Sequence, residues 1–134
     1  MHLDERHSGL TERIDVFRVA LVTGLAASVR HDAHIVTAAQ LGELPHGRVV
    51  RVAGIVTARQ RPQSAGGVMF VTLEDETGYV NLILWERVWS RARRIASNSR
   101  LLEVQGLLQK EGLVTHVVAR RLVDRTPMLG IVVT

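Results

Sequence analysis

The chain has 134 residues, of which 46% are hydrophobic, 22% are charged and 4% are aromatic. This length suits one small globular domain with a short appendage, and it is too short for a large multidomain catalyst such as a kinase. Cysteine is absent, which excludes disulfide frameworks, thiolate zinc sites and thiol nucleophiles and favours a reducing compartment.

The apolar runs of the chain are short. Runs such as Val68–Val71 and Leu82–Trp85 fall far below the ~20 apolar residues that a membrane-spanning helix needs. Residues 1–7 are mostly charged or polar and include acidic side chains, so they do not resemble a signal peptide. We therefore expect a soluble cytoplasmic protein without a membrane partner.

The charged residues are mostly arginine. The formal net charge is +4, and all but one of the 17 basic residues are arginine. Because the planar guanidinium pairs bidentately with phosphate and stacks on bases, this composition permits nucleic-acid binding. The alternative is that the arginines lie on solvated surfaces and that their number reflects genome composition. A net charge of +4 is modest for a nucleic-acid binder.

The first third of the chain differs in pattern from the rest. Pro45-His46-Gly47 marks a boundary turn, so we expect a partly helical or irregular segment over 1–45, a main domain over 46–125 and a tail over 126–134. A short helical turn is predicted over Thr37–Leu41. Within 1–45, apolar residues spaced three or four apart predict one helix face: Ile14, Phe17, Leu21 and Leu25.

The main domain contains five β-rich runs and one stretch with helical periodicity. The predicted strands are Arg48–Arg61, Val68–Glu74, Tyr79–Trp85, Leu101–Gln109 and Leu113–Val123, with a helix over Glu86–Ser97. Gly54, in the middle of the long first run, predicts a bulge or sharp bend. This order predicts an all-β domain with a capping helix, a five-stranded OB-fold barrel. The alternative is an open α+β sheet built from the same elements.

Catalytic and metal-binding patterns are weak. His31 and His34 are three apart with Asp32 between them, but a metal site needs further ligands at suitable spacing. The acidic run Glu74-Asp75-Glu76 falls at a strand end and a tight turn, where aspartate and glycine are typical turn residues. Residues 64–67 lack the lysine and hydroxyl residue of a phosphate-binding loop. We therefore predict no catalytic residue, no metal and no cofactor.

Alternation along the second and third strands predicts a binding face. If Val80, Leu82 and Leu84 fill the barrel, side chains at the odd positions of the third strand and at 70 and 72 of the second point outward. Aromatic platforms and cations are what single-strand binding requires. The predicted nucleic-acid-binding residues are Arg59, Arg61, Phe70, Thr72, Tyr79, Asn81 and Trp85.

The same aromatic residues have an alternative interpretation. In the alternative reading, Phe70 and Trp85 belong to the core and Tyr79 covers the barrel rim, because a shift of one residue in register reverses every assignment. Trp89, on the predicted helix, is expected to plug one end of the barrel. Another function, tRNA binding, has no motif support beyond the general OB pattern.

Several runs together resemble one known family. They are Val50–Val56, Arg59–Pro62, Gly67–Gly78, Asn81–Trp85 and His116–Ala119. Over Leu41–Asp124 the chain closely resembles the C-terminal OB domain of error-prone bacterial C-family DNA polymerases, paralogues of the polymerase III alpha subunit. Thr23-Gly24-Leu25 is similar to a segment that precedes this domain in the family.

The resemblance implies a function for the domain but not for a whole polymerase. The family's PHP domain, metal-binding palm, fingers and β-clamp region have no counterpart here, so no enzyme activity is expected of this chain on its own. The implied role is contact with single-stranded DNA in damage-tolerant synthesis and repair, with polymerase or translesion-synthesis accessory proteins as further partners. The alternative is an OB domain that docks onto a polymerase or accessory subunit.

Overall fold

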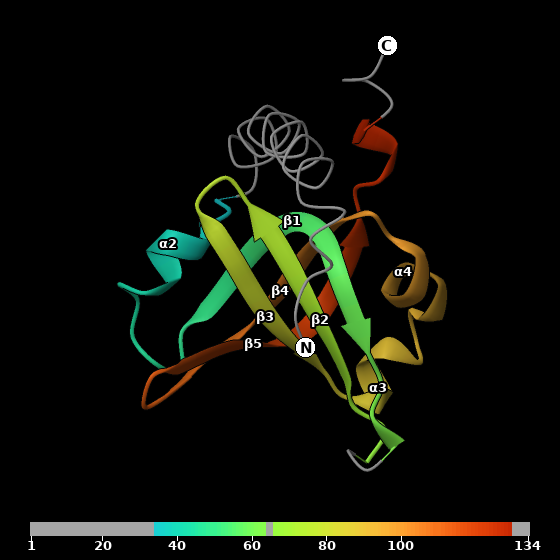
Figure 1. Cartoon of the computed structure of the whole chain (residues 1–134), viewed down its shortest axis with the longest axis horizontal. Coiled ribbons are helices and arrows are strands. Elements are labelled where there is room, and N and C mark those ends of the chain that lie inside the picture. The colour runs from blue at the N-terminus through green and yellow to red at the C-terminus, as the bar shows by residue number, and fades with distance from the viewer. Residues whose placement is uncertain (1–33, 64–65, 130–134) are drawn as a thin grey trace, which may run out of the picture.

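The computed structural model describes residues 34–63 and 66–129, and it contains a closed five-stranded barrel in the order β1-β2-β3-β5-β4 (Figure 1). The strands are β1 (Val49–Gln60), β2 (Met69–Asp75), β3 (Gly78–Leu84), β4 (Leu101–Glu111) and β5 (Val114–Asp124). The described helices are α2 (Ala38–Leu41), α3 (Glu86–Trp89) and α4 (Arg93–Asn98). The predicted OB-fold barrel is confirmed, and the open sheet is excluded. The helix predicted around Ile14–Leu25 lies outside the described residues.

The barrel closes because β1 pairs with two different strands. Its first half, Val49–Ile55, runs antiparallel to β4, and its second half, from Ile55 to Gln60, runs antiparallel to β2. The predicted bend lies at Gly54, where these halves meet. A Cβ at this position would stand 2.6 Å from the carbonyl oxygen of Glu74. Only glycine permits so close an approach of two backbones. A short parallel pairing of β3 with β5 completes the ring.

Alternate residues of the strands fill the barrel. Val80, Leu82 and Leu84 are each at most 3% exposed, and across the β2–β3 pair they are opposed by Leu73, Val71 and Met69 respectively. Trp89 is 3% exposed, belongs to the same core cluster and donates its indole Nε1–H to the carbonyl oxygen of Gly67 at 2.7 Å.

The helical stretch after β3 is broken, which corrects the prediction of one helix over Glu86–Ser97. The structure has α3 and α4 instead, and Ala92 between them has φ −125° and ψ 45°, outside the helical region. The break lets Trp89 and Ala96, both of which belong to the core, face the barrel from two separate short helices. Periodicity alone did not predict this break, because the apolar spacing continues through it.

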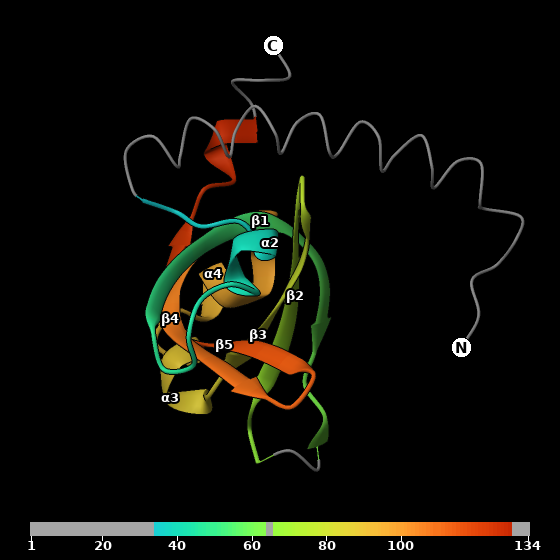
Figure 2. The ribbon, with the colours of Figure 1, turned by 90° about the vertical axis from the view of Figure 1, so that its left-hand side faces the viewer.

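Segments on both sides of the predicted 46–125 domain pack against the barrel. Leu41 of α2 is 3% exposed within the core cluster, and Ile35 packs on Ala53 of β1. After β5, Leu129 is buried against Ile55 and Leu101. Figure 2 shows α2 in front of the opening enclosed by the strands, whereas α3 and α4 lie on the other side of the barrel in Figure 1. The packed unit thus includes 34–44 and 126–129.

In the acidic run at the β2–β3 turn, Asp75 has the structural role in the turn that the sequence predicted. The buried Asp75 carboxylate accepts hydrogen bonds from the backbone N–H groups of Thr77 at 2.8 Å and Gly78 at 3.1 Å. It also accepts one from the backbone N–H of Ala38 at 2.7 Å, which fastens the start of α2 to the turn. A buried carboxylate needs such donors to offset its lost hydration.

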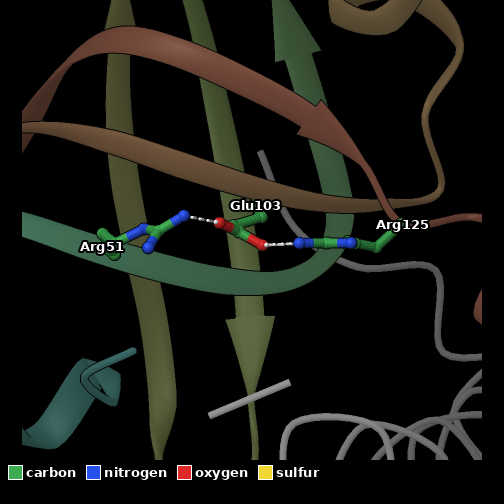
Figure 3. A network of polar contacts seen from close by, with 3 residues as sticks. All are labelled: Arg51, Glu103 and Arg125. Carbon is green, nitrogen blue, oxygen red and sulfur yellow. Dashed lines mark hydrogen bonds and ion pairs between the residues drawn. The ribbon is translucent and has the colours of Figure 1, made fainter. Parts of the chain in front are cut away.

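A buried ion triad fastens the chain that follows β5 to the barrel (Figure 3). Glu103 on β4 is 1% exposed, and its two carboxylate oxygens meet Arg51 of β1 at 2.9 Å and Arg125 at 2.8 Å. The two arginines compensate the negative charge of the buried Glu103 carboxylate. Without such partners, a buried ion is left as an uncompensated charge.

The bend in β1 generates the first prediction. Gly54→Ala should lower the free energy of unfolding by about 1–3 kcal/mol, because its Cβ has to displace the β2 backbone. Urea denaturation followed by circular dichroism measures this change. Gly42→Ala is the matched control, since Gly42 is exposed and has helical φ −61°; it should change stability by no more than about 0.5 kcal/mol. Equal effects of the two substitutions would contradict the proposed tight approach at Gly54.

Candidate functional site

The outward face of β2 and β3 carries three exposed aromatic side chains. Phe70, Tyr79 and Trp85 are 37%, 61% and 48% exposed. Thr72 opposes Asn81 in the pairing of these strands, and opposed residues share a face of the sheet. The predicted register is confirmed, and the alternative in which Phe70 and Trp85 belong to the core is wrong.

The end of β1 adds two residues to this face that the sequence analysis missed. Gln60 opposes Phe70 and Ala58 opposes Thr72, so both lie on the outward side. The pairing shifts register between Val56 and Ala58, which leaves Thr57 as the extra residue of a β-bulge. The extra residue inverts the alternation along β1 and turns the odd positions that follow it toward the inside.

This bulge corrects the prediction for Arg59. Arg59 lies within β1 opposite the buried Val71, so it does not share the outward face with Phe70 and Thr72. Its guanidinium donates from Nε to the carbonyl oxygen of Ala96 at 2.7 Å and from Nη2 to the carbonyl oxygen of Ser99. Partial burial lowers the pKa of Arg59 from its ordinary value through desolvation. These contacts give Arg59 a structural role at the end of α4.

Arg61 lies at the same end of the barrel as Arg59. Its guanidinium carbon stands 4.1 Å from the centroid of the Trp89 ring, and that of Arg93 stands 5.4 Å from the same centroid. Both distances are within the range of a cation–π interaction. Arg61 is exposed, but its guanidinium is held over the indole that plugs the barrel and does not lie in the groove beside Phe70.

A shallow groove of about 210 Å³ crosses the outward face. Its rim carries polar side chains from three strands, and His116 of β5 completes it. The lining residues that point outward are Ala58, Gln60, Phe70, Thr72, Asn81 and His116. Amide, hydroxyl and imidazole groups can donate and accept hydrogen bonds, which suits the edges of unpaired bases.

A second groove, of about 260 Å³, continues from the first toward the β4–β5 hairpin. Asn81 and His116 line both grooves, and Tyr79, Thr115 and Leu113 extend the second one. His116 was not among the binding residues predicted from the sequence. Its place next to Asn81 depends on the parallel pairing of Leu82 with Val117, which residue types alone do not predict.

The two grooves are lined by polar and apolar side chains. The described residues that line them include no arginine, lysine, aspartate or glutamate. Over 34–63 and 66–129, no group of three or more histidine, aspartate or glutamate residues is arranged to hold a metal ion. In the same residues, no helix is long and apolar enough to cross a membrane. The chemistry of the two grooves is therefore stacking and neutral hydrogen bonding, with the acidic Glu74 lying outside them opposite Tyr79.

Comparison with known proteins identifies the barrel. Residues 50–123 match the family described as OB-fold nucleic acid binding domain. The chain is 52% identical over 96 residues to an error-prone DNA polymerase of Alkalilimnicola ehrlichii, a match that covers 72% of this chain and 9% of the polymerase. It is 55% identical over 85 residues to error-prone DNA polymerase 1 of Rhizobium meliloti, covering 63% of this chain and 8% of that protein.

Solved structures share the architecture at lower identity. Asparaginyl-tRNA synthetase from Pyrococcus horikoshii superposes with a TM-score of 0.55 at 22% identity, over 68% of this chain and 23% of the synthetase. This likeness concerns the fold alone. The resemblance to the error-prone polymerase family is confirmed by the sequence matches, which lie within a small share of each polymerase.

The contacts of Arg59 generate the second prediction. Arg59→Met should lower the free energy of unfolding by about 1–3 kcal/mol, because two carbonyl oxygens near the end of α4 lose a charged donor. Thermal and urea denaturation measure the loss. Arg94→Met, an exposed position on the same helix, serves as the control and should stay within about 0.5 kcal/mol of the wild type. Unchanged stability of Arg59→Met would show that these hydrogen bonds contribute little.

Proposed function

Because the chain belongs to the family of OB-fold nucleic acid binding domains, we propose that it binds single-stranded DNA on the outward face of β2 and β3. The observation that carries the proposal is the alignment of three exposed aromatic side chains, Phe70, Tyr79 and Trp85, on one face of a closed barrel. Large exposed aromatic groups cost free energy in water, so three of them along one face suggest a ligand that covers them.

The dimensions of the face suit a short single strand. Tyr79 lies near the start of β3 and Trp85 directly follows its end, about 20 Å away at the usual rise of a β-strand. Single-strand sites on OB folds take about 4–16 nucleotides, and stacking contributes about 1–3 kcal/mol per base. Between the aromatic residues, Thr72 and Asn81 supply hydrogen-bonding groups toward base edges.

The relatives suggest where such binding is used. Their names describe error-prone DNA polymerases, so we extend the proposal to contact with single-stranded template during damage-tolerant synthesis and repair. In that setting the barrel binds and positions a strand, and nucleotidyl transfer is not part of its proposed role. Polymerase subunits or translesion-synthesis accessory proteins would be its protein partners.

One observation favours a second candidate function, docking onto such a protein partner. At the tip of the β4–β5 hairpin, Leu113 is 103% exposed and Val114 is 50% exposed. An apolar tip of this kind can insert into a pocket of another protein. Salt dependence separates the two candidates, since DNA affinity that involves phosphates falls with salt whereas a docking domain has little DNA affinity to titrate.

The aromatic face generates the third prediction. Tyr79→Ala and Phe70→Ala should each weaken binding of a fluorescent oligothymidine by about fivefold to hundredfold, which is ~1–3 kcal/mol at tenfold per 1.4 kcal/mol. Fluorescence anisotropy measures the dissociation constants, and circular dichroism verifies each fold. Since Trp85 is 48% exposed, Trp85→Ala can be tested in the same way.

Val123→Ala is the matched control for these substitutions. Val123 is 37% exposed, as Phe70 is, but it lies on β5 opposite Glu103, outside the aromatic face. It should bind like the wild type. If both aromatic variants fold and bind like Val123→Ala, the β2–β3 face is not the binding surface.

A further inference from the structure

A third groove, between α3 and β5, differs from the two grooves of the aromatic face because it is lined by arginines. This groove is larger than the other two, at about 450 Å³. Three arginines line it, Arg87, Arg91 and Arg120, together with apolar side chains such as Val88 and Val118. An apolar floor edged by guanidinium groups offers one surface for sugars and bases and another for phosphates.

Two local features bring these arginines together. Arg87 lies in α3 and Arg91 follows four residues later, in the turn before α4. Arg120 sits where the β4–β5 pairing skips a residue, since Gln105 pairs with Arg121 and the next pair is Gly106 with Ala119. Such an irregularity re-aims a side chain, and it leaves Arg120 exposed on the wall of the groove.

Among the described residues, no acidic side chain neutralises the positive charge of the groove, since neither an aspartate nor a glutamate is part of its lining. In the described part of the chain, the ion pairs of arginine are those of Arg51 and Arg125 with Glu103. The neighbouring Glu86 directs its carboxylate toward Gly67 and is not part of the groove lining. Three guanidinium groups around one concave surface, with no ion-pair partner among the described residues, favour an anionic ligand.

The groove is continuous with the aromatic face through Trp85. The backbone at Trp85 is still extended, with φ −69° and ψ 154°, so its side chain continues the outward alternation of β3. The same residue lines the arginine groove. Trp85 therefore lies at the point where a strand leaving the aromatic face would enter the groove.

We propose that the arginine groove binds consecutive phosphates of the same single strand whose bases stack on the β2–β3 face. This inference rests on the proposed function and adds to it the path of the bound strand and the length of strand that the protein contacts. The bound strand passes Trp85 and continues between α3 and β5. A short oligonucleotide occupies the aromatic face alone, whereas a longer one also reaches Arg87, Arg91 and Arg120.

Two oligothymidines of about 5 and about 12 nucleotides, within the site sizes of OB folds, test the path. The groove variant carries Arg87→Gln, Arg91→Gln and Arg120→Gln. The control variant carries Arg48→Gln, Arg94→Gln and Arg100→Gln, which remove equal charge from exposed positions outside the groove. Anisotropy titrations over a range of salt concentrations give the dissociation constant and the salt slope of each pair, and circular dichroism checks each fold.

We expect the wild type to bind the longer strand more tightly, with a steeper salt slope. The groove variant should lose at least tenfold in affinity for the longer strand and about 2 units of its salt slope, since each phosphate contact on a single strand contributes about 0.7. Its affinity for the shorter strand should match that of the control variant.

Three outcomes would overturn the path. If the groove and control variants lose affinity for the longer strand equally, only net charge matters and the groove is not a site. If the groove variant binds both strands like the wild type, the groove proposal fails while the aromatic face stands. If the wild type binds neither strand at low salt, the proposed function fails as well.

Discussion

The bend of β1 at Gly54 is the constraint on which the rest of the structure depends. One strand can pair with β4 through its first half and with β2 through its second half only if its backbone turns sharply between them. The turn brings position 54 so close to Glu74 that a side chain has no room. Closure then follows, and with it a curved outer surface on which β2 and β3 stand side by side (Figure 1).

Closure divides the outer surface of the barrel into a covered part and an open part. Over β1 and β4, Ile35 and Leu129 bury Ala53, Ile55 and Leu101, and the ion triad of Glu103 fastens Arg125 beside them. This face is already used for stability. On β2 and β3, by contrast, the outward side chains of Phe70, Tyr79 and Asn81 remain exposed. The aromatic side chains thus stand where the described chain does not cover the barrel.

The parts that the sequence predicted are those that depend on regular alternation. In β2 and β3, which pair without irregularity, the outward positions of Phe70, Tyr79 and Trp85 follow from a period of two. Arg59 was misplaced because the bulge at Thr57 inverts the alternation, and no residue type in that run marks a bulge there. Likewise, the position of His116 beside Asn81 depends on the pairing of β5 with β3. That pairing is a property of barrel closure and not of the residue types.

The central claim is that single-stranded DNA lies on the outward face of β2 and β3. Backbone amide chemical shifts of ¹⁵N-labelled protein, followed during titration with a short oligothymidine, test it most directly. The account predicts saturable shifts at Phe70, Thr72, Tyr79 and Asn81, with Ala53 and Leu101 on the covered face unchanged. Shifts confined to the hairpin tip at Leu113, or spread evenly over exposed arginines, would contradict it.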